Sequence, residues 1–262
     1  MKEHLSYMRD CSKKNKKKRI IIIAICCIIL VLLSVLIVYL IKNVFLTNAN
    51  KENKKLQKKL LSYVEETINE DSGEKEYKID FKKLKKMNPD TIAYLRVNNT
   101  EINNIVVKGN DNSYYLSHNF KKEDNDNTGW IFADCNNKFD FTDYNIVIYG
   151  QNAENDSIFG TLRNCLKEEW YSNEENKYIT IVTEDSVKKF EIFSVYQENL
   201  NDEAIKVNFE KDNEFLDFLD KAKAKSIKDF NIELTAERGI LTLVAYNNDN
   251  SNKIIVHAVN VF

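Results

Sequence analysis

The most constraining feature of this 262-residue chain is an uncharged apolar run at residues 20–41, IIIIAICCIILVLLSVLIVYLI. As a helix rising 1.5 Å per residue, these 22 residues would extend roughly 33 Å, which is enough to cross a bilayer once. The run exceeds the ~7–15 residues of a signal-peptide core, and no convincing small-residue cleavage site follows it. We therefore expect one transmembrane helix rather than a cleaved signal peptide or a buried core helix.

A basic cluster, KKNKKKR at residues 13–19, predicts the orientation of this helix. Lys and Arg accumulate on the cytosolic side of membrane helices, so the N-terminus is expected in the cytosol and the C-terminal domain outside the plasma membrane. A lysine-rich stretch at residues 51–59 weakens the charge contrast. The sequence thus predicts a basic cytoplasmic tail, a transmembrane helix, a helical linker and an extracellular domain, at residues 1–19, 20–41, 42–76 and 77–262.

Charge and cysteine content restrict the ligands of the exposed part. Residues 42–262 carry 30 basic and 38 acidic side chains, a net charge of −8, whereas nucleic-acid binding needs a cationic face. The five cysteines form no CxxC pair and have no metal-type spacing with the three histidines. We therefore expect no nucleic acid, no metal and no cofactor. The sequence leaves open whether Cys135 and Cys165 form a disulfide.

Eight segments after Pro89 have the composition and spacing of β-strands, and clusters of Asn, Asp, Gly or Ser separate them. A set of eight short strands is typical of a mainly β barrel or sandwich. The segments are IAYLRV, INNIVVKG, GWIFADC, YNIVIYG, KYITIVT, VKKFEIFSVY, ILTLVAY and KIIVHAVNV.

Helical periodicity occurs before and between these strands. Apolar residues recur at helical spacing from Leu56 to Ile68, which predicts an amphipathic helix leading from the membrane to the domain. A shorter helical pattern ends before Pro89. Two helical insertions are expected among the strands, at residues 157–166 and 214–225.

From about Leu84 onward, the order of motifs resembles that of the class B sortases, which are membrane-anchored transpeptidases of Gram-positive envelopes. The resemblance implies an eight-stranded sortase-type β-barrel with N-terminal helices and a helix inserted before the penultimate strand. The matching stretches are NPDTIAYLRVNNTEINNIVV, DNSYYLSHNF, TGWIFADC, NIVIYGQN, SIFGTLRN, FEIFSVY, FLDFLDKAKAKS and ILTLVAYNNDNSNKIIVHA.

Three family positions carry the chemistry of these enzymes. A cysteine at the end of a TLxTC strand attacks the carbonyl of a sorting-signal peptide, a histidine in YGHN exchanges protons, and an arginine on the last strand stabilises the oxyanion. Here YGHN reads YGQN, TLxTC reads TLVAY, and the last strand opens with KIIV. The resemblance therefore places Gln151, Tyr246 and Lys253 where the family has histidine, cysteine and arginine.

Each replacement removes a chemical property that acyl transfer needs. A phenol, with a reference pKa of roughly 10, replaces a thiol that supplies thiolate near neutral pH. Gln151 does not titrate and cannot exchange a proton in turnover. Lys253 keeps a positive charge but lacks the planar fork that donates two parallel hydrogen bonds. We conclude that the site contains no competent catalytic residues.

Other residues could supply a nucleophile or a base only in less common arrangements. Tyr246 could attack a substrate, but that needs an activating base and the family's base position is Gln151. We interpret Cys135 and Cys165 as inert, packed cysteines. His118 lies in a polar loop and His257 on the last strand, and no GxSxG motif supports a serine triad.

These observations lead to one favoured function and two alternatives. The favoured hypothesis is a non-catalytic binding or scaffolding factor for surface-protein or pilus attachment at the cell envelope, with a sorting-signal peptide, a pilin or an active sortase as partner. The second is an active transpeptidase that uses non-standard residues or those of a partner. The third is a relic without function.

Overall fold

The computed structural model describes residues 2–70, 73, 75–124, 129–152, 156–202, 205–247 and 251–261. The chain divides into two compact units, Met1–Asn48 and Ala49–Phe262, and helix α1 (Lys2–Leu61) begins in the first and ends in the second. In the searched part of α1, Ile25–Leu61, one 18-residue window has a mean hydropathy of 3.0 and no buried residue. This helix is therefore long and apolar enough to cross a membrane.

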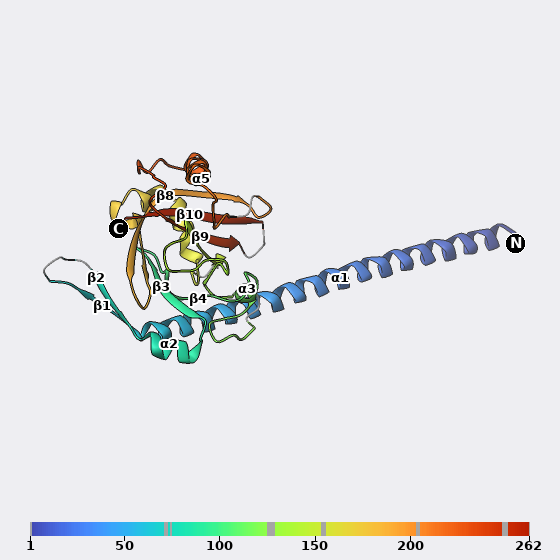
Figure 1. Ribbon diagram of the computed structural model, residues 1–262. Coiled ribbons are helices and arrows are strands. Elements are labelled where there is room, and N and C mark those ends of the chain that lie inside the picture. The colour runs from blue at the N-terminus through green and yellow to red at the C-terminus, as the bar shows by residue number, and fades with distance from the viewer. Residues whose placement is uncertain are drawn as a thin grey trace. The chain divides into compact units, whose positions relative to one another are not determined.

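The second unit is built around a closed eight-stranded barrel with the strand order β10-β8-β7-β3-β4-β5-β6-β9 (Figure 1). The pairs β4–β5 and β6–β9 are parallel, and the other neighbours are antiparallel. All eight strands predicted from the sequence lie in this barrel, which confirms the expected fold. Their bounds are Thr91–Val97 (β3), Asn103–Val107 (β4), Phe132–Ala133 (β5), Asn145–Asn152 (β6), Tyr178–Val182 (β7), Val187–Asn199 (β8), Ile240–Asn247 (β9) and Asn252–Asn260 (β10).

The strands near the site are buried on both faces. Seven of the eight residues of β6 are buried. The interior of the barrel is packed, and helices and loops cover its outside. Strands covered on both faces read as continuous apolar runs, which accounts for sequences such as NIVIYG and ILTLVA. Polar residues in these strands therefore need partners inside the protein.

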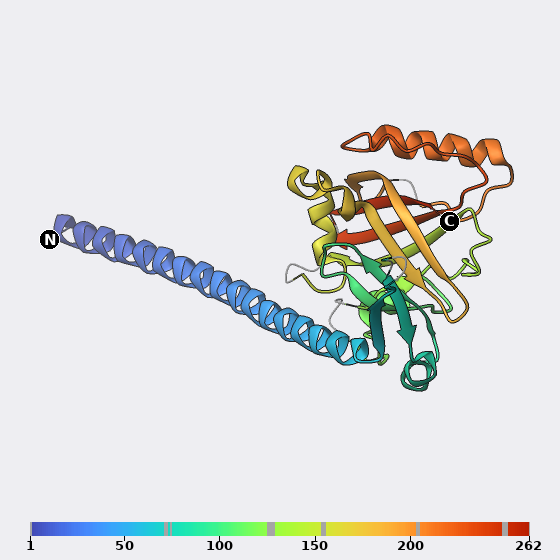
Figure 2. The ribbon, with the colours of Figure 1, turned by 90° about the vertical axis from the view of Figure 1, so that its left-hand side faces the viewer.

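Helix α5 (Asp212–Lys225) covers the outside of β8, β9 and β10 (Figures 1 and 2). Its apolar stripe, which includes Phe215 and Leu219, packs with Phe193 of β8, Ile240 of β9 and Val259 of β10. This is the helix expected before the penultimate strand. The remaining short helices are α2 (Phe81–Met87), α3 (Tyr114–Ser117), η1 (Gly160–Leu166), α4 (Glu168–Tyr171) and η2 (Glu174–Lys177).

The linker differs from the sequence-based expectation. The predicted amphipathic helix ends at Leu61 instead of continuing to Ile68. Residues Val64–Ile68 form strand β1, which pairs with β2 (Lys75–Ile79) in an antiparallel hairpin. The spacing of Val64 and Ile68 fits a helix locally, but pairing with β2, which begins seven residues after Ile68, determines the strand. The prediction of a helical linker over residues 42–76 is therefore wrong beyond Leu61. The proposed domain limits stay a prediction.

Candidate functional site

The three family positions lie in one row across three neighbouring strands of the barrel. Gln151 on β6 is the direct partner of Tyr246 on β9, and Tyr246 is the direct partner of Lys253 on β10. Directly opposed residues of neighbouring strands point to the same face of a sheet, with Cβ atoms roughly 5 Å apart. The barrel therefore brings together the three positions that are separated by up to 102 residues in the chain.

A fourth residue extends this row and forms an ion pair with Lys253. Glu198 on β8 is the direct partner of Lys253, and the Lys253 Nζ lies 3.2 Å from the Glu198 Oε1. The side chains are only 5% and 8% exposed. Lys225, from the last turn of α5, approaches the other carboxylate oxygen of Glu198 at 2.9 Å. The ammonium group of Lys253 is thus held by a carboxylate from the protein itself.

Tyr246 is packed in a way that disfavours its ionised form. Its ring stacks on that of Tyr149, with ring centres 6.0 Å apart and planes 12° from parallel. Burial, and secondarily the negative charge of Asp134, raise the pKa of Tyr246. The Tyr149 hydroxyl donates to Asp134 at 2.9 Å, and burial is likewise the main cause of its raised pKa. A phenol in this setting remains protonated and is a poor nucleophile.

Gln151 leaves a hydrogen-bond acceptor unused. The residue is 8% exposed, and no described residue donates a hydrogen bond to its Oε1 atom. The neighbouring amide of Asn152 donates to the Asn247 Oδ1 atom at 2.6 Å. Buried acceptors without a donor are costly, by about 1–3 kcal/mol. The Oε1 atom of Gln151 therefore lies in the packed interior, and Gln151 does not line the pocket beside the row.

A pocket of about 510 Å³ opens beside the row. Tyr246 and Lys253 contribute to one side, and Leu200, Ile205 and Val207, from the connection between β8 and α5, add apolar surface. The polar lining comprises Asn112, Asp134, Asn136, Tyr149, Asp202 and Asn208. Apolar walls with a few fixed polar groups are typical of sites for small ligands and extended peptides.

The other sequence candidates do not form a catalytic site. Cys165 is completely buried, and burial raises the pKa of its thiol. Cys135 is partly buried, and both cysteines are free thiols. His118 stacks on Tyr114 with ring centres 4.0 Å apart. These groups lack the activated nucleophile and neighbouring base that acyl transfer requires.

His257 lies in a buried hydrogen-bond network behind the row. Its Nδ1 atom is 2.8 Å from the Thr242 hydroxyl, and its Nε2 atom is 3.1 Å from the Tyr196 hydroxyl. Burial, with a smaller contribution from the charge of Lys225, lowers the pKa of His257 to about 3. The imidazole is therefore neutral at physiological pH and belongs to the packing of β8, β9 and β10.

Sequence reasoning missed Glu198, Lys225, Tyr149 and Asp134. Tyr149 stands two residues before Gln151, so the period of two along β6 could have placed it on the same face. Glu198 had no such signal, because its pairing with Lys253 depends on the register between β8 and β10, which includes a shift at His257/Ala258. Long-range register of this kind is not encoded in a local pattern.

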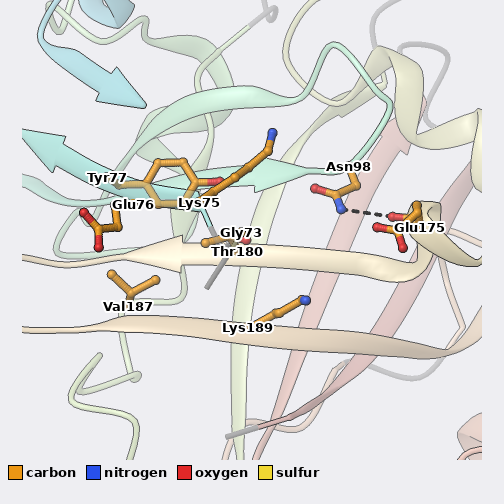
Figure 3. Close-up of a pocket in the computed structure, with 9 residues that line it drawn as sticks. All are labelled: Gly73, Lys75, Glu76, Tyr77, Asn98, Glu175, Thr180, Val187 and Lys189. Atoms are coloured by element: carbon orange, nitrogen blue, oxygen red, sulfur yellow. Dashed lines mark hydrogen bonds between the residues drawn. The ribbon is translucent and has the colours of Figure 1, made fainter. Parts of the chain in front are cut away.

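A second pocket lies away from the row, between the β1–β2 hairpin and strands β7 and β8 (Figure 3). Its volume is about 680 Å³, and Tyr77, Thr180 and Val187 are among its lining residues. Its charged residues are mixed in sign, and Lys75 is paired with Glu66 at 2.6 Å. This pocket contains none of the three family positions, so we place the candidate site at the row.

Comparison with known proteins identifies the family. No family model matches the chain. It is 32% identical to sortase B of Listeria monocytogenes over 169 residues, which cover 64% of this chain and 67% of that protein. It is 29% identical to Staphylococcus aureus sortase B over 163 residues, which cover 62% of this chain and 66% of that protein.

Solved structures give the same result. The structure of Clostridium perfringens sortase B is 37% identical, covers 70% of this chain and 100% of the solved chain, and superposes with a TM-score of 0.65. A substrate complex of S. aureus sortase B is 27% identical, covers 69% of this chain and 84% of the solved chain, and has a TM-score of 0.64. With its closed barrel, its inserted helix and the aligned row of strand positions, the chain belongs to the class B sortase family.

Proposed function

We propose that this protein is a non-catalytic class B sortase that binds peptides, or scaffolds their handling, during surface-protein attachment at the cell envelope. The observation that carries the proposal is the ion pair between Lys253 and Glu198 in the row that also holds Gln151 and Tyr246. An oxyanion needs a cation or donors left unpaired by the protein, and here the Lys253 ammonium group already pairs with the Glu198 carboxylate.

The other two positions support the same proposal. Acyl transfer requires a nucleophile that is deprotonated or has a base beside it. The pKa of Tyr246 is raised by burial and by Asp134, and Gln151 has no titratable group. In the family pattern, transpeptidation uses cysteine, histidine and arginine at these positions, and this row carries Tyr246, Gln151 and Lys253 instead.

Binding, in contrast, needs only shape and hydrogen-bonding groups. The 510 Å³ pocket, with its apolar strip and its polar lining, provides these features. The S. aureus relative has been solved with its substrate bound. Sorting-signal peptides are therefore the ligands that we propose, and a pilin or an active sortase would be the protein partner.

We further propose that α1 anchors the domain in the plasma membrane, with the N-terminus in the cytosol. The apolar window of α1 and the basic cluster at residues 13–19 support this orientation. The barrel would then be displayed on the outer side, where envelope peptides are accessible.

The test is titration of the protein with sorting-signal peptides, followed by NMR. We expect shifts at Gln151 and Tyr246 with micromolar affinity, equivalent to roughly −8 kcal/mol. Tyr246→Ala should alter the affinity, because it removes one wall of the pocket. Tyr171→Ala, at the half-buried tyrosine of α4, is the matched control and should leave it unchanged. Peptide cleavage by the unmodified protein, or shifts confined to another face, would refute the proposal.

A further inference from the structure

The end of helix α1 is fixed on the barrel domain by one face. Leu56 and Leu60 are buried in the main core. The Asn53 side chain donates to the Gly129 carbonyl oxygen at 3.1 Å, and the Gln57 side chain donates to that of Asn103, the first residue of β4, at 2.8 Å. These contacts fix the rotation of the helix about its own axis.

The opposite face of the same turns carries five lysines, and none of them has an ion-pair partner among the described residues. All are exposed except Lys54, which is half-buried. Their spacing of three, four and seven residues places them on one side of a helix with 3.6 residues per turn. We call this set the lysine stripe: Lys51, Lys54, Lys55, Lys58 and Lys59.

The lysine stripe contrasts in charge with the rest of the domain. Residues 60–262 carry 24 basic and 37 acidic side chains, a net charge of −13. Residues 51–59 carry five lysines and only Glu52. A polyanion repels an acidic domain. A positive surface on one face of a helix therefore determines which side of the domain can approach a polyanion.

We propose that the lysine stripe binds the anionic phospholipid headgroups of the membrane in which α1 is anchored. This inference depends on the anchoring proposed above. Lys51 follows the end of the apolar run at residue 41 by ten residues, and this stretch is helical, so it spans about 15 Å. The ligand within this reach that has the complementary charge is a bilayer surface with negative headgroups.

Headgroup binding by the lysine stripe is weak for an isolated helix, and it becomes stronger when a membrane anchor holds the helix near the bilayer. Each lysine close to an anionic bilayer strengthens binding by about fivefold, and salt screens the effect within a Debye length. The membrane anchor makes the contact intramolecular, which raises the effective headgroup concentration to the millimolar range or above. Because the rotation of the helix is fixed by Asn53 and Gln57, headgroup binding also determines which side of the barrel faces the bilayer.

The experiment uses the full chain in lipid nanodiscs made either of phosphatidylcholine alone or of phosphatidylcholine with phosphatidylglycerol. Lysine acylation, quantified by mass spectrometry, reports the accessibility of each amine. We expect the lysine stripe to react about threefold or more slowly in the anionic discs, and the difference to disappear at about 0.5 M NaCl. Lys167, Lys211 and Lys221, which are exposed elsewhere on the domain, should react equally in both kinds of disc.

Two triple variants with the same change in net charge provide the control. Lys51→Gln/Lys55→Gln/Lys58→Gln should abolish the protection of Lys54 and Lys59, whereas Lys167→Gln/Lys211→Gln/Lys221→Gln should retain it. Glutamine preserves helix propensity, so a loss of protection reports charge rather than unfolding.

The outcomes separate the possible failures. A chain that enters neither kind of disc refutes the membrane anchoring. A chain that enters both, with equal reactivity of the lysine stripe, overturns the headgroup contact while the anchor stands. If the lysine stripe is protected in neutral discs only after soluble inorganic polyphosphate is added, its ligand is a free polyanion. That result would also overturn our inference.

Discussion

Lys253 and Glu198 are direct partners across β10 and β8, and their charged groups meet at 3.2 Å with both side chains almost completely buried. A buried ion pair is held in place by the penalty of exposing either charge alone to an apolar interior. This geometry therefore makes the pair a structural element of the barrel.

We predict that Glu198→Gln destabilises the domain by about 3 kcal/mol, because it removes the carboxylate that pairs with the buried ammonium group of Lys253. Urea unfolding followed by fluorescence measures the change. The double variant Glu198→Gln/Lys253→Gln should regain part of the loss, since it removes both charges. Equal stability of Glu198→Gln and the unmodified protein would show that water already solvates the pair.

Stability should fall as the solution becomes acidic, partly because of His257. The pKa of this residue is lowered to about 3 in the folded protein, against an ordinary value near 6.5. Below pH 6.5 the unfolded chain binds a proton that the folded protein does not, so the free energy of unfolding drops by up to about 1.4 kcal/mol per pH unit until the pH approaches 3. Above pH 6.5 the contribution is constant.

His257→Gln isolates this effect from the titration of carboxylates. Urea unfolding of both proteins at pH 7, 5.5 and 4.5 should show a shallower pH dependence for the variant. Lys225, which faces the same network, is present in both proteins, so its contribution cancels in the comparison. Parallel curves for the two proteins would contradict the buried, neutral state of His257.

Restoring the family residues should recover activity only in combination. Catalytic residues act as a unit, so Tyr246→Cys alone should produce almost no cleavage of a sorting-signal peptide. Adding Gln151→His and Lys253→Arg should produce a trace, and adding Glu198→Gln should increase it by freeing the arginine. Product formation is followed by mass spectrometry, with alkylation of the new thiol as the control. Turnover by the unmodified protein that Tyr246→Phe abolishes would count against a non-catalytic site.

The two cysteines of the domain should differ in reactivity. Cys165 is buried and its thiol has a raised pKa, whereas Cys135 is partly accessible. Iodoacetamide should modify Cys135 slowly in the folded protein and Cys165 only after unfolding. A disulfide between them in the purified protein would contradict the structure.

The proposed orientation of the chain in the membrane predicts a protease pattern. Protease added to intact cells from which the wall has been stripped should digest the domain beyond about residue 51 and spare the N-terminal tail. Detergent permeabilisation serves as the control, because it exposes both ends. Full protection of a C-terminal tag in intact cells would reverse the orientation.

Local patterns were sufficient to predict the eight strands and the inserted helix, because alternation and helical spacing are properties of short windows. The prediction of a helix through Val64 and Ile68 was wrong, because pairing with β2 determines a strand there although the local spacing also fits a helix. The family resemblance led to Gln151, Tyr246 and Lys253, and the register now places them in one row. Glu198 could not be found in advance, because only the folded barrel brings it to Lys253.

The position of β10 between β8 and β9 has a consequence for biogenesis. It closes the barrel, and it supplies both the neighbour of Tyr246 and the counterion of Glu198. A nascent chain whose synthesis has not passed residue 252 therefore has an open sheet with two unpaired edges, and contacts of such long sequence separation form slowly. Until this last strand is added, the open edges of β8 and β9 are free to pair with other chains.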